Sequence, residues 1–103
     1  MFGIFGPSET ESEIRSEITK KIDETERAFR VARAIYDHHG LPDGDYHTAY
    51  EEFCNFHLMW KGTYGGSKLQ LKLIRSSLNK LHKLRMLTAS NLAQKYGNPD
   101  ISN

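Results

Sequence analysis

Valine occurs only once in the 103 residues, at Val31, and no segment alternates apolar and polar residues over the length of a strand. Strands are rich in β-branched residues, and their side chains alternate between two faces. The sequence therefore gives little support to a β-sheet, and we expect helices instead.

Cysteine is equally scarce, because Cys54 is the single one in the chain. One cysteine forms no disulfide within the chain and cannot build a cysteine-rich zinc site. No uncharged apolar run approaches the roughly 18 residues of a membrane span. Residues 1–6 lack the basic flank and the length of a signal peptide. We expect a cytoplasmic protein that makes no membrane contact.

Motifs that carry chemistry are missing as well. Residues 62–66 are rich in glycine but contain neither a P-loop pattern nor Gly-x-Gly-x-x-Gly, and no serine lies in a nucleophile elbow. Cys54 has His47 and His57 nearby in the sequence, but it borders an aromatic helix face, where a cysteine is usually inert packing. We therefore predict a non-enzymatic protein with no catalytic residue and no cofactor.

The histidines raise a metal site as a weaker hypothesis. On one predicted helix, His47, Glu51 and Cys54 occupy one arc, so three side chains of the ligand type could converge there. The chain contains no Cys-x-x-Cys, no His-Glu-x-x-His and no Glu-x-x-His motif. We predict no metal site, although the sequence alone does not tell whether this arc binds metal.

The first predicted helix begins near Ser8, where Glu11 completes a capping box, with Thr10 or Ser12 as alternative caps. It ends before Gly40, a residue type that favours the left-handed conformation at a helix terminus. Between these points, apolar residues recur every three or four positions and form one narrow packing stripe: Ile14, Ile18, Ile22, Thr25, Phe29, Ala32 and Tyr36.

A second helix is predicted from Asp43 or Asp45 to Lys61, and a third from its cap at Ser67 to about Tyr96. The second carries an aromatic-rich face that we assign to the core: Tyr46, Ala49, Tyr50, Phe53, Phe56, His57 and Trp60. The third has an apolar arc too broad for one neighbour: Leu69, Leu71, Leu73, Ile74, Leu78, Leu81, Leu84, Leu87 and Leu92.

The predicted fold is an all-α three-helix bundle with long first and third helices and a shorter, aromatic-rich middle helix. We predict one domain over residues 1–103, with flexible ends at 1–7 and 98–103. The short middle helix should leave apolar surface uncovered near residues 14–22 and 84–92. We therefore predict a homo-oligomer, with a homodimer as the expected form, whose interface includes Leu84, Leu87 and Leu92.

Charge is divided unevenly along the chain, although its net value is only +1. Residues 1–60 hold 12 acidic and 6 basic side chains, whereas residues 61–103 hold 8 basic side chains and a single acid, Asp100. The third predicted helix carries a basic stripe that we assign to partner binding: Lys68, Lys72, Arg75, Asn79, His82 and Lys83.

Two further interpretations of the basic stripe stay open. It could be a solvated face that complements the acidic first helix, or it could bind the phosphates of a nucleic acid. A pI near 7.9 weakens the nucleic-acid interpretation, because dedicated nucleic-acid-binding domains are usually more basic. We expect a regulatory or interaction protein with an acidic protein partner, and a nucleic-acid-binding regulator is the alternative.

Overall fold

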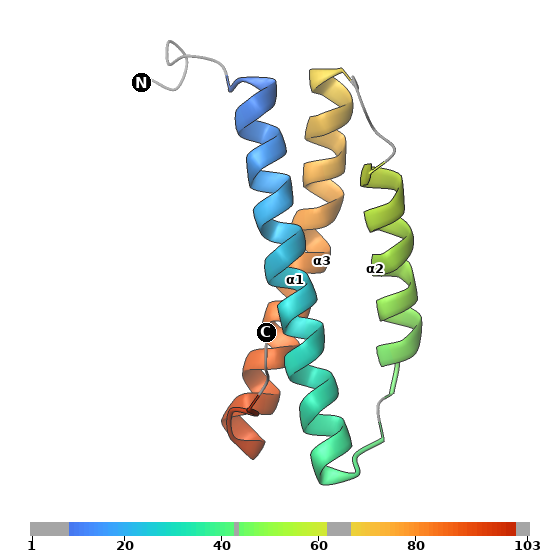
Figure 1. Cartoon of the computed structure of the whole chain (residues 1–103), viewed down its shortest axis with the longest axis vertical. Helices are drawn as coiled ribbons and strands as arrows, with labels where there is room; N and C mark the ends of the chain where they lie inside the picture. Colours follow the sequence, from blue (N-terminus) through green and yellow to red (C-terminus); the bar gives the residue numbers. More distant parts are fainter. Residues whose placement is uncertain (1–8, 43, 62–66, 101–103) are drawn as a thin grey trace.

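The computed structural model describes residues 9–42, 44–61 and 67–100. They form three helices: α1 (Glu11–His39), α2 (Tyr46–Lys61) and α3 (Lys68–Tyr96). The chain runs down α1, up α2 and down α3, so that α1 and α3 are parallel (Figure 1). The predicted all-α bundle with a short, aromatic-rich middle helix is confirmed. None of these helices combines the length and the apolar character needed to cross a membrane.

Local sequence signals set the ends of the long helices. Thr10 caps α1 in a reciprocal capping box with Glu13. Of the predicted caps, the alternative at Thr10 is therefore the correct one. Ser67 and Gln70 form the same box at the start of α3. Gly40 ends α1 in the left-handed conformation, with φ of 60° and ψ of 35°. Ser8, the other predicted cap, lies outside the described residues.

The predicted stripe of α1 is the spine of the core. Ile14, Ile18 and Phe29 are at most 1% exposed, and of the whole stripe Tyr36 alone is only partly buried. The backbones of α1 and α3 lie close together, whereas α2 stands farther off (Figure 1). Small buried residues, Ala28 on α1 and Ala89 on α3, permit this close approach along a shared groove.

Aromatic side chains fill the wider space between α1 and α2. The ring of Phe29 lies 5.7, 5.2 and 5.4 Å, centre to centre, from those of Tyr46, Tyr50 and Phe53. Most of these pairs meet edge to face, the geometry that the ring quadrupole favours. The assignment of the α2 aromatic face to the core is confirmed, with Tyr50, Phe56, His57 and Trp60 at its half-buried margin.

The prediction that apolar surface is uncovered near residues 14–22 is wrong. Ile14 and Ile18 are fully buried, and Ile22 is almost so. The short α2 does not leave this part of α1 uncovered, for two reasons. α3 begins beside the start of α1, and large side chains of α2 extend beyond its backbone. Trp60, near the end of α2, lies under Arg15 of α1, with the guanidinium carbon 5.5 Å from the ring centre.

The structure describes only part of the two ends that were predicted to be flexible. Residues 1–7 and 101–103 lie outside the described part of the chain. Asn98, Pro99 and Asp100 are described, and they line a cleft against the end of α1.

Candidate functional site

Three members of the predicted basic stripe bind α1 rather than facing solvent alone. Arg75 bonds to Glu17, Asn79 accepts a hydrogen bond from Lys21, and His82 donates from Nε2 to Glu24 over 2.9 Å. Each of these pairs joins residues 58 positions apart. Because α1 and α3 are parallel, the constant separation gives a polar ladder in register along one side of the two helices.

Arg75 is the strongest rung of this ladder. Its Nη1 lies 2.6 Å from Glu9 and 2.9 Å from Glu17, and its Nη2 lies 2.9 Å from the second oxygen of Glu9. This fork geometry is the one in which guanidinium and carboxylate bind most strongly. Hydrogen bonds from Arg75 and its positive charge lower the pKa of Glu9 and of Glu17 below 4.5. The same contacts raise the pKa of Arg75.

The lowered glutamate pKa values predict loss of stability in acid. Their contribution is complete above pH 4.5 and is lost as the pH falls through the lowered values, because the unfolded chain takes up protons first. The wild-type melting temperature should therefore fall between about pH 5 and pH 3, and Arg75→Gln should flatten that slope. Thermal melts across this range test it, with exposed Lys20→Gln as the control. An unchanged slope in Arg75→Gln would contradict the prediction.

A different surface of α3 points away from the bundle, and we call it the leucine–lysine face. Four leucines on it range from 50% exposed at Leu84 to 68% at Leu69. Helical spacing puts them on one side of α3, together with three exposed lysines. Its members are Leu69, Leu73, Leu84, Leu87, Lys72, Lys80 and Lys83.

The lysines of this face differ from the residues of the polar ladder. Lys80 and Lys83 make no ion pair in the part of the chain that the structure describes. Lys72 interacts electrostatically with Glu9 but forms no salt bridge to it in the described structure. Lys68, which is half-buried, also interacts electrostatically with Glu9. The predicted basic stripe thus divides into one part that binds α1 and one that faces solvent.

The chain matches no family model, and it matches no curated protein and no solved structure. The geometry therefore carries the functional argument.

The residues predicted to form the oligomer interface differ in their exposure to solvent. Leu84 and Leu87 are exposed, at 50% and 56%. Leu92 is only partly exposed and packs against the core of its own chain. Leu69 and Leu73, which the sequence placed in the general apolar arc, are instead among the most exposed large apolar side chains of the described residues. Their position outside the α1 and α2 contacts could not be read from leucine content alone.

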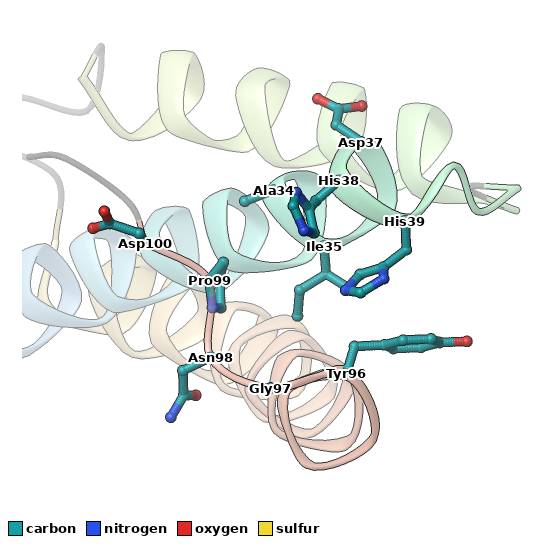
Figure 2. Close-up of a pocket in the computed structure, with 10 residues that line it drawn as sticks. All are labelled: Ala34, Ile35, Asp37, His38, His39, Tyr96, Gly97, Asn98, Pro99 and Asp100. Atoms are coloured by element: carbon teal, nitrogen blue, oxygen red, sulfur yellow. The ribbon is translucent and has the colours of Figure 1, made fainter.

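A cleft of about 660 Å³ lies where α1 and α3 end (Figure 2). Its ionisable groups do not converge: Asp37 points away and accepts a hydrogen bond from Arg33 over 3.0 Å. The ring of His39 packs on Tyr96 at 4.8 Å and on His38 at 4.9 Å. These ring contacts join the end of α1 to the end of α3, so the two histidines pack on neighbouring rings beside the cleft.

The hypothesis of a metal-binding arc on α2 gains no support. Among the described residues, no three His, Cys, Asp or Glu side chains are placed to hold an ion. His47 and Glu51 are exposed, whereas Cys54 is half-buried beside Tyr50. Burial is the main cause that raises the pKa of Tyr50, with the neighbouring thiol second. The contacts of Cys54 are thus those of packing against the aromatic face.

Arg85 is a residue whose role the sequence did not signal. It sits on the buried side of α3, with its side chain 10% exposed and its guanidinium carbon 5.6 Å from the centre of the Phe29 ring. Its Nη2 lies 4.0 Å from Asp45, and its Nε has no hydrogen-bond partner among the described residues. A cation in this position costs stability unless its donors are satisfied.

Proposed function

We propose that this protein is a non-enzymatic interaction domain that binds another protein through the leucine–lysine face of α3. One observation carries the proposal: four exposed leucines share one side of α3 with three lysines that form no salt bridge to any residue the structure describes. Exposed apolar side chains gathered in this way are typical of protein interfaces, and single scattered ones are not.

The composition of this face also favours protein over nucleic acid. A phosphate-binding surface is dominated by cations and polar groups, whereas leucines here outnumber lysines. Two of the basic side chains that would have supported nucleic-acid binding, Arg75 and His82, are bound to α1 carboxylates. The nucleic-acid alternative therefore retains only the lysines.

Site-specific photo-crosslinking in the native cell tests the proposal. A photoreactive amino acid at Leu84 should yield a covalent adduct with protein, because this side chain is 50% exposed and belongs to the proposed interface. The matched control replaces Ser16, which is exposed on α1 and outside the face, and it should yield little adduct.

The chemistry of the adduct decides between the candidate functions. Adducts that survive nuclease and disappear with protease support a protein partner. Adducts that nuclease removes would favour the nucleic-acid alternative. Equal labelling from Ser16 and Leu84 would contradict any dedicated interface on α3.

A further inference from the structure

The charge of the leucine–lysine face narrows the partner to a particular chemistry. From its cap at Ser67 to Gly97, the α3 segment contains no acidic residue, so nothing on this helix neutralises the lysines of the face. Lys80 lies between the two leucine pairs, while Lys72 and Lys83 lie beside them. A partner that covers the leucines must therefore also meet three positive charges.

A second copy of α3 would cover the leucines of this face, but it would bring further positive charges close to the lysines. An antiparallel pairing that puts Leu69 against Leu87 of the other copy brings Lys72 close to Lys83 of that copy. A parallel pairing brings each lysine beside its own counterpart. Either arrangement adds like-charge repulsion to the interface, whereas carboxylates at the same places would add attraction.

The length of the face sets the shape of the partner. Leu69 and Leu87 are 18 positions apart on one continuous helix, which corresponds to about 27 Å at 1.5 Å per residue. An amphipathic helix of about 25 residues covers this distance, and its apolar stripe can pack against the leucines along the whole face.

We infer that the leucine–lysine face of α3 binds an acidic amphipathic helix of another protein, and this inference rests on the proposed function. The apolar stripe of that helix packs between Leu69 and Leu87, and its carboxylates meet Lys72, Lys80 and Lys83. Leucine contacts supply most of the affinity, and the lysines select acidic helices over neutral or basic ones.

Synthetic helical peptides test this inference on the full chain. The first probe is a peptide of about 25 residues with a leucine stripe flanked by Glu, and the second has Lys in place of every Glu. A third keeps the composition of the first but scatters its leucines around the helix. The first should bind with a dissociation constant that rises with salt, and the other two at least tenfold more weakly.

Matched protein variants locate the binding. Lys80→Glu with Lys83→Glu should weaken binding of the acidic peptide by about tenfold, because each attraction becomes a repulsion. Lys20→Glu with Arg30→Glu changes the net charge equally at exposed positions of α1, away from the face, and should have little effect. Leu84→Gln with Leu87→Gln should abolish binding, while circular dichroism verifies that the fold is intact.

Two results would overturn the inference while leaving the proposed function standing. Equal binding of the acidic and basic peptides would remove the charge selection. A dimer in sedimentation that tightens at high salt and dissociates in Leu84→Gln would assign the face to a second copy, as the sequence-based prediction of a homodimer holds. In both cases, an adduct between Leu84 and a different protein would still support the proposed function.

Discussion

Phe29→Ala is expected to unfold the protein or lower its melting temperature by more than 10 °C. The ring is 1% exposed and contacts three aromatic rings of α2 on one side and the Arg85 guanidinium of α3 on another. Removing a buried phenylalanine costs about 3–5 kcal/mol, out of the 5–15 kcal/mol typical of a domain. Thermal and urea unfolding followed by circular dichroism measure the loss.

Leu69→Ala is the control for Phe29→Ala, because Leu69 is 68% exposed and its truncation leaves no cavity. Its melting temperature should stay within a few degrees of wild type. If Phe29→Ala changed the melting temperature as little as Leu69→Ala, the aromatic cluster would not be the centre of the core.

Arg85→Met is expected to make the protein more stable. The methionine keeps an unbranched apolar stem over Phe29 and removes a buried Nε that finds no hydrogen-bond partner in the described part of the chain. Replacing a buried ion pair by hydrophobic groups of similar volume is often neutral or adds about 1–4 kcal/mol to the free energy of unfolding. The stabilising outcome is expected here because the partner carboxylate, Asp45, is 81% exposed and stays hydrated when the guanidinium is removed. For a domain of this size, such a gain in stability corresponds to a rise of at least about 4 °C in melting temperature.

Arg85→Ala separates the stem from the charge. It removes both, so lost packing should make it less stable than Arg85→Met. Asp45 is 81% exposed and 4.0 Å from the guanidinium, so Asp45→Asn should have a small effect. A fall in stability of Arg85→Met as large as that of Arg85→Ala would show that the guanidinium itself holds the helices together.

The sequence was a good guide to the helices because their signals are local. The capping residues Thr10 and Ser67 act within one turn, and Gly40 supplies the left-handed residue where α1 ends. The period of the α1 stripe likewise predicts one buried face, and Ile14 and Phe29 lie on it as expected.

The candidate functional surface was less predictable because it depends on which neighbour each face of α3 meets. Arg75 and Lys83 look alike in the sequence, yet the first binds Glu17 and the second makes no ion pair among the described residues. Leu71 and Leu73 are only two positions apart, but one is buried and the other is 61% exposed. Spacing gives relative directions around a helix, and only the packing of α1 and α2 says which direction is inward.

The constant separation of the polar ladder also bears on why one arrangement of the helices wins over its near alternatives. Sliding α3 along α1 by four residues in one direction would place Lys21 opposite Arg75, and sliding it in the other would place Lys21 opposite Lys83. Apolar contacts between two long helices tolerate such a slip, because leucines and isoleucines recur every turn. Like charges do not, so the ladder discriminates against misaligned bundles that bury nearly as much apolar surface.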